Sequence, residues 1–150
     1  MATKAAAKKT PTKNRRRAAR GGAGAQLTNE QNAESGFRAS KALSENLQRV
    51  LVDLLELQLQ GKQAHWNVRG SNFIAIHELL DTLVANAQGF ADLAAERIVA
   101  LGLPIDARVS VVAEKAAPTK VPAGFAQWQT EIRAVIDDMD AVIADVQAAI

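Results

Sequence analysis

The sequence predicts an all-α fold, a bundle of long amphipathic helices. Apolar residues recur with helical spacing in three stretches, at about residues 37–66, 72–101 and 123–150. Gly70-Ser71-Asn72 has the composition of a turn between the first two stretches, and three prolines fall between the second and the third. With 150 residues, 48% hydrophobic and 23% charged, the chain fits one globular domain.

The first expected helix, at about 37–66, has one apolar stripe. The residues of this stripe are Leu43, Leu47, Val50, Leu51, Leu54 and Leu57. A capping-box pattern at residues 28–31 and a start near Ser40 are alternatives for its beginning. His65 falls in its last turn, followed by Trp66. From spacing alone, His65 is interpreted as an ordinary polar histidine and Trp66 as a core residue.

The second expected helix, at about 72–101, has two different faces. At 100° per residue, Asp81, Asp92 and Glu96 lie within about 100° of His77, and the apolar residues lie about 140° away. Those apolar residues are Phe73, Ile76, Leu80, Ala87, Ala94 and Ile98. The polar face is either a solvated surface or a set of metal ligands in two i, i+4 pairs. Histidine combined with carboxylate suits iron, zinc or manganese.

The two pairs are too far apart to bind one ion within one chain. Asp81 and Asp92 are separated by eleven residues, about 16 Å along a helix. His77 and Asp81 therefore form one half-site, which His65 could complete from the preceding helix. Asp92 and Glu96 form the other half-site. If two copies of the helix pack antiparallel about a two-fold axis, each half-site meets the complementary half-site of the partner, which gives two composite sites.

The connection at 102–122 is long for a compact domain, and a short helix is expected within it at about 109–115. The third long helix is expected at 123–150. Its apolar stripe consists of Phe125, Trp128, Ile132, Val135, Ile136, Met139, Val142, Ile143 and Val146. The opposite side carries Asp137, Asp138, Asp140 and Asp145, which we expect to be a solvated face.

The N-terminal 25 residues are expected to form a disordered basic tail, because they lack large apolar residues after Met1. Residues 1–22 contain eight basic side chains and no acid, and the rest of the chain has a net charge of −6. The basic residues are Lys4, Lys8, Lys9, Lys13, Arg15, Arg16, Arg17 and Arg20. The tail is interpreted as a sequence-independent DNA-binding arm, with a solubilising tail as the alternative.

Composition excludes several classes of protein. The chain has no cysteine, which removes disulfides, thiolate metal sites and cysteine nucleophiles. It has no G-x-S-x-G elbow, no apolar run of membrane-spanning length and no apolar segment after the basic N-terminus that would make a secretory signal. We therefore expect a cytoplasmic protein without a membrane partner.

The segment HWNVRGSNFIAIHELLD, followed by D-x-x-x-E-R, resembles the Dps family of mini-ferritins over about residues 46–150. The resemblance implies a ferritin-like four-helix bundle that assembles into a dodecameric shell, with ferroxidase sites between subunits at two-fold axes. It implies an iron(II)-oxidising enzyme that stores iron, prefers hydrogen peroxide and protects DNA in the nucleoid. The implied metal ligands are His65, His77, Asp81, Asp92 and Glu96. Trp66 would lie beside the iron and intercept radicals.

The resemblance calls for four long helices, and only three are expected here. The sequence stops where a loop and a fourth helix would follow. We therefore expect an incomplete chain with an apolar groove, which aggregates or forms poorly ordered oligomers.

Two other functions compete with the ferroxidase. One is a nucleoid-compacting DNA-binding protein whose metal site is structural. The other is a helical interaction module whose groove accepts a partner's helix.

Overall fold

The computed structural model describes residues 39–149, so the eight basic residues of the N-terminal tail and the capping-box pattern lie outside the described residues. The elements in chain order are α1 (Lys41–Asn67), β1 (Val68–Arg69), α2 (Phe73–Ala100), α3 (Val109–Lys115), β2 (Ala126–Gln127) and α4 (Trp128–Ala148). The all-α prediction is confirmed, with three long helices and one short helix among these residues.

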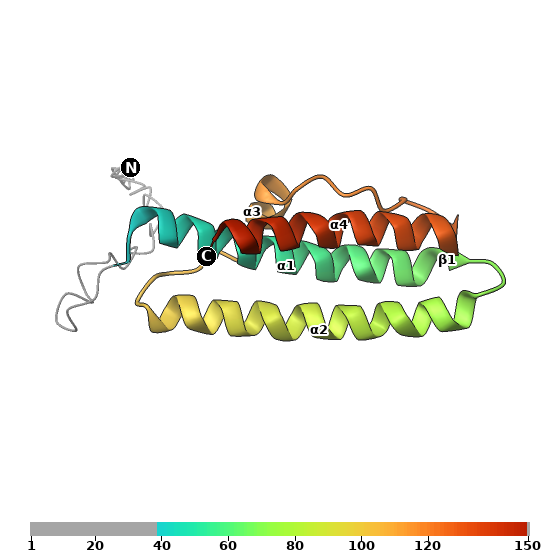
Figure 1. The fold of residues 1–150 in the computed structure, drawn as a ribbon, viewed down its shortest axis with the longest axis horizontal. Coiled ribbons are helices and arrows are strands. Elements are labelled where there is room, and N and C mark those ends of the chain that lie inside the picture. Colours follow the sequence, from blue (N-terminus) through green and yellow to red (C-terminus); the bar gives the residue numbers. More distant parts are fainter. Residues whose placement is uncertain (1–38, 150) are drawn as a thin grey trace, which may run out of the picture.

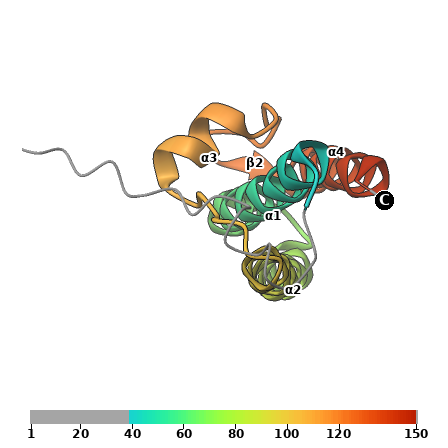
Figure 2. The same ribbon diagram turned by 90° about the vertical axis from the view of Figure 1, so that its left-hand side faces the viewer.

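Helix α1 lies between the two other long helices (Figures 1 and 2). α2 folds back antiparallel to α1 after a tight turn, and α4 runs antiparallel to α1 along another side of it. Contacts between α2 and α4 are sparse, whereas α1 packs extensively on both. α3 and the connection around it pass beside α1, away from α2. Both long partners are therefore held in the bundle mainly through α1.

The helix boundaries differ from the predicted ones for local reasons. α1 begins at Lys41 rather than at about 37, in agreement with the alternative start near Ser40. Ser40 is the N-cap, and its side-chain oxygen accepts a hydrogen bond from the backbone N–H of Leu43 at 3.1 Å. α4 begins at Trp128 rather than 123. Residues 126–127 instead form β2, which pairs in parallel with β1, so that the turn after α1 is joined to the start of α4.

The core has two clusters of apolar residues. Leu51, Leu54, Ala91 and Ile98 form one between α1 and α2, and Ala64, Leu80 and Val135 form the other among all three long helices. Gly61 permits the close approach of α1 and α2. A Cβ atom there would lie 2.8 Å from Cγ2 of Val84, which is shorter than van der Waals contact allows.

Several residues that were expected to be buried are exposed. The side chain of Trp66 is 63% exposed, so its interpretation as a core residue is wrong. Phe125 is 73% exposed and precedes α4; its ring lies under the guanidinium of Arg69 at 3.8 Å. Ile136 and Ile143 of α4 are each about half exposed. For Ile136 and Ile143, helical spacing gives the side of α4 on which they lie, but it does not give how much of that side is covered.

Gln48 joins the part of the connection that precedes α3 to α1. The amide of Gln48 donates to the carbonyl of Asp106 at 2.8 Å and accepts from the backbone N–H of Asp106 at 3.0 Å. The backbone N–H and C=O of Asp106 are therefore both hydrogen-bonded to a side chain of α1. Among residues 39–149, no helix combines the length and the apolar composition that crossing a membrane requires.

Glu131 is an acidic residue inside the bundle that the sequence analysis did not single out. Its side chain is 0% exposed, and neither carboxyl oxygen has a hydrogen-bond partner among the described residues. Burial raises the pKa of this carboxyl from 4.5 to about 7. The folded state therefore favours the protonated acid, and stability falls as the pH rises from about 4.5 through about 7.

Replacing Glu131 with glutamine should raise the free energy of unfolding at about pH 8 by roughly 1–3 kcal/mol, because a buried unpaired charge is removed. The gain should shrink towards zero near pH 4.5, the ordinary pKa of this carboxyl, where the wild-type group is neutral. Urea denaturation at several pH values measures the free energy of unfolding of the wild type and of the variant. The exposed Glu78→Gln variant is the control. A gain that is the same at every pH would contradict the prediction.

Candidate metal centre

Three of the five predicted ligands meet where α1 and α2 face each other next to the turn. His65 lies near the end of α1, His77 lies in the first half of α2, and Asp81 follows one turn later. One donor atom from each residue lies within 4.8 Å of those of the other two. His65 is buried, His77 is half-buried and Asp81 is exposed, so the cluster opens towards the surface of α2.

The two imidazole rings are fixed by reciprocal hydrogen bonds. Nδ1 of His65 lies 2.9 Å from the carbonyl oxygen of His77, and Nδ1 of His77 lies 3.0 Å from the carbonyl oxygen of His65. The rings stack with centroids 3.6 Å apart, and Phe73 packs against the His77 ring. Because a carbonyl oxygen only accepts, each Nδ1 carries the proton in the neutral ring. Each Nε2 then has the lone pair that a metal requires.

Lys62 is a fourth member of the cluster, which sequence reasoning missed. Its ammonium group donates a hydrogen bond to Oδ1 of Asp81. This bond, aided by the nearby imidazole of His65, holds the pKa of Asp81 below its ordinary value. Asp81 is therefore an anionic carboxylate, already paired with a cation. The signal was present in the sequence, because Lys62 precedes His65 by three residues and so shares its face of α1.

Asp92 and Glu96 lie farther along α2, apart from this cluster, and both are exposed. Large apolar side chains on the same helix are exposed as well, among them Leu79, Phe90 and Leu93. Within the described part of one chain, the five predicted ligands thus form one assembled half and one separate carboxylate pair.

The turn beside the cluster has a defined geometry. Gly70 has φ +116°, a conformation that disfavours other residues, and a Cβ atom there would lie 2.7 Å from Oε1 of Gln127. Arg69 donates to the carbonyl of Val68 at 2.7 Å and stacks on Phe125. Glycine at position 70 therefore lets the turn between the two histidine-bearing helices approach the start of α4.

Comparison with known proteins places the fold. Residues 44–150 match the ferritin family, described as the ferritin-like domain. The chain is 40% identical over 92 residues to DNA protection during starvation protein 2 of Deinococcus radiodurans, covering 61% of this chain and 38% of that protein. It is 38% identical over 97 residues to the DNA protection during starvation protein of Agrobacterium fabrum, covering 65% and 56%. The chain thus spans only 38–56% of these relatives.

Solved structures give the same placement. The structure of Dps from Microbacterium arborescens in the high iron form superimposes with a TM-score of 0.69 at 65% sequence identity, covering 72% of this chain and 70% of that one. Dps92 from Deinococcus radiodurans also gives a TM-score of 0.69, at 32% identity, covering 73% and 66%.

Replacing Lys62 with methionine should tighten binding of a divalent cation at this cluster by about tenfold, because a bound metal would no longer compete with an ammonium for Asp81. Isothermal titration calorimetry with Co²⁺ under anaerobic conditions gives the affinity. Lys120→Met is the matched control, since Lys120 pairs with Asp137 at 3.0 Å away from the cluster. Equal or weaker Co²⁺ affinity in the Lys62 variant would show that this lysine does not compete with the metal.

Proposed function

Because the chain belongs to the Dps family of ferritin-like proteins, we propose that it oxidises Fe(II), preferably with hydrogen peroxide, stores the ferric product and protects DNA. The observation that carries the proposal is the cluster of His65, His77 and Asp81, whose donor atoms lie within 4.8 Å of one another. Two nitrogen donors and one carboxylate suit iron(II) as the substrate.

The side chains of the cluster have different roles in this reaction. His65 and His77 supply neutral Nε2 donors, because their Nδ1 atoms are held by backbone carbonyls. Asp81 supplies negative charge, which favours the rise from Fe(II) to Fe(III). Two iron ions give two electrons to one peroxide, which takes up two protons and leaves as two water molecules. Trp66 follows His65 in the chain and is exposed, and in this proposal it donates an electron to a stray hydroxyl radical.

The second half of the site comes from another subunit in this proposal. Asp92 and Glu96 are exposed on α2, next to exposed apolar side chains such as Phe90 and Leu93 that a partner helix would cover. An antiparallel α2 pair about a two-fold axis brings the partner's Asp92 and Glu96 to the histidine cluster. Such dimers would build the dodecameric shell, with the iron mineral inside.

DNA is the second proposed partner. The basic tail would neutralise phosphates without reading sequence, and the protein would act in the cytoplasm, associated with the nucleoid. The names of the relatives from Deinococcus and Agrobacterium, DNA protection during starvation proteins, support this assignment.

A subunit-mixing experiment tests the composite site. One variant carries His77→Ala and Asp81→Ala, and the other carries Asp92→Ala and Glu96→Ala. Each alone should oxidise iron slowly. A mixed dimer contains one doubly damaged and one intact site, so it should regain about half of the wild-type rate. Anaerobic Fe(II) loading followed by stoichiometric peroxide gives the rate, and native mass spectrometry verifies mixing. Mixed dimers no faster than either variant would disprove the intersubunit site.

Deleting residues 1–22 should weaken DNA binding and flatten its salt dependence, since each lost phosphate contact removes about 0.9 from the log–log slope. Iron oxidation should survive. Gel shifts at several salt concentrations measure the binding. A chain in which the tail residues are shuffled, with all eight charges kept, should bind as the wild type does. Unchanged DNA binding after the deletion would exclude the tail as the DNA arm.

A further inference from the structure

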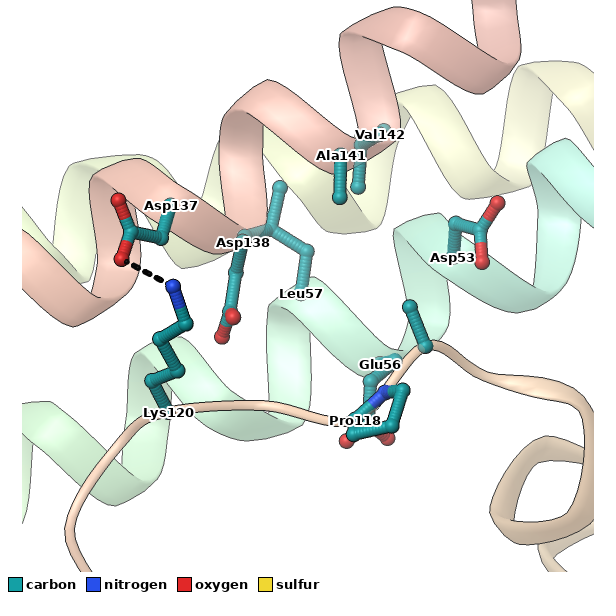
Figure 3. Close-up of a pocket in the computed structure, with 10 residues that line it drawn as sticks. Asp53, Glu56, Leu57, Pro118, Lys120, Asp137, Asp138, Ala141 and Val142 are labelled. Atoms are coloured by element: carbon teal, nitrogen blue, oxygen red, sulfur yellow. Dashed lines mark hydrogen bonds and ion pairs between the residues drawn. The ribbon is translucent and has the colours of Figure 1, made fainter.

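An acidic pocket lies between α1, the connection that follows α3, and α4 (Figure 3). Its volume is about 220 Å³, below the roughly 300–1,000 Å³ of a site for a drug-sized ligand. Four carboxylates line it, Asp53 and Glu56 from α1 and Asp137 and Asp138 from α4. Lys120, also in the lining, pairs with Asp137 at 3.0 Å. The other three carboxylates therefore need a different source of positive charge.

Two of these three carboxylates are held by neutral donors. Asp138 accepts a hydrogen bond from the hydroxyl of Thr119 at 2.5 Å, and Glu56 accepts one from the amide of Gln60 at 2.6 Å. Hydroxyl and amide groups satisfy an oxygen but bring no positive charge. Among residues 39–149, no lysine or arginine forms an ion pair with either acid. Asp138 and Asp145 are half-buried, so the expectation of a solvated face is wrong for both.

Asp53 is the third carboxylate, and it is the most deeply buried of the lining acids. It is 6% exposed, and its Oδ2 atom is buried without a hydrogen-bond partner among residues 39–149. Arg49, one turn earlier on α1, forms its ion pair with Asp145 instead, at 3.5 Å. A buried carboxylate without a hydrogen bond or a counter-charge costs free energy. A cation bound in the pocket beside Asp53 would recover part of that cost.

The lining favours an organic cation over a metal ion. Within the described part of the chain, three metal-ligating side chains converge within 4.8 Å only at the cluster of His65, His77 and Asp81. The acids of the pocket do not form such a set. Aliphatic side chains also line it, among them Leu57 and Val142 (Figure 3). An ammonium group donates hydrogen bonds to carboxylates, and its methylene chain packs on apolar side chains, so an aliphatic amine uses both parts of the lining.

We propose that this pocket binds a small aliphatic diamine. Its two ammonium groups would offset two of the three uncompensated carboxylates, Asp53 and either Glu56 or Asp138, and its methylene groups would pack on Leu57 and Val142. A primary amine is charged at neutral pH, since the pKa of the comparable lysine side chain is about 10.4. A bound diamine would join α1 to α4, so it would also stabilise the folded chain. This site is separate from the histidine cluster and does not depend on the proposed iron oxidation.

Isothermal titration calorimetry of the full chain with 1,4-diaminobutane, without metal ions, tests the proposal. Burial raises the pKa of Asp53 to about 7, so the titration is made at about pH 8, where this carboxylate is ionised. The diamine should bind saturably with one molecule per chain, and it should raise the melting temperature. Butylamine has one ammonium group and should bind about tenfold more weakly. No saturable binding, or butylamine binding as tightly as the diamine, would overturn the proposal.

Asp53→Asn removes the buried charge and should weaken diamine binding by about tenfold or more. Asp140→Asn is the matched control, because it removes an exposed carboxylate of α4 that lies outside the lining of this pocket. It should bind as the wild type does. Equal losses in the two variants would mean a general attraction of amines to an acidic surface and would overturn the proposal.

A second pair of variants tests the pocket without changing any charge. Ala117 lines the pocket, so Ala117→Leu should fill part of it and weaken diamine binding by about tenfold or more. Ala113→Leu, at an exposed position of α3 outside the lining, should have no effect. These variants decide the question if Asp53→Asn does not fold. Wild-type affinity in Ala117→Leu would show that the diamine binds elsewhere.

Discussion

The packing of α1 against helices on two of its sides is the constraint on which the rest of the structure depends. α2 and α4 have little contact with each other, so each takes its position from α1. Gly61 lets α2 approach α1 closely, Ser40 caps the start of α1, and Gln48 joins α1 to the connection after α2. The histidine cluster follows from this arrangement, because it lies where the end of α1 and the start of α2 are held side by side.

The features that depend on helical periodicity were predicted from the sequence. Helical spacing located the three long helices, and the i, i+4 rule put His77 beside Asp81 on one face of the second helix. That His65 joins them requires a tight reversal between α1 and α2, which Gly70-Ser71-Asn72 indicated. The separation of Asp92 and Glu96 from the cluster also follows from helical rise alone.

What the sequence did not predict depends on contacts between distant segments. A two-residue ladder between β1 and β2 has no periodicity to detect, so the start of α4 was placed five residues too early. The exposure of Trp66 depends on which neighbours cover it, and hydrophobicity alone favoured a buried position. Asp138 and Asp145 of α4 were assigned to a solvated face, whereas neighbouring segments leave both only half exposed, and the buried Glu131 was not singled out at all. Lys62 was missed because lysine is not a metal ligand, although it donates a hydrogen bond to the predicted ligand Asp81.

The reciprocal hydrogen bonds between His65 and His77 have a consequence for the entropy of metal binding. A free histidine side chain loses roughly 0.5–1.5 kcal/mol of rotamer entropy when a ligand immobilises it. Here both rings are stacked on each other and tied to backbone carbonyls 2.9 and 3.0 Å away, by contacts within the chain itself. That ordering cost is incurred when the chain folds and does not recur with each ion. In the proposed iron site, successive ions would therefore meet donors that are already in position.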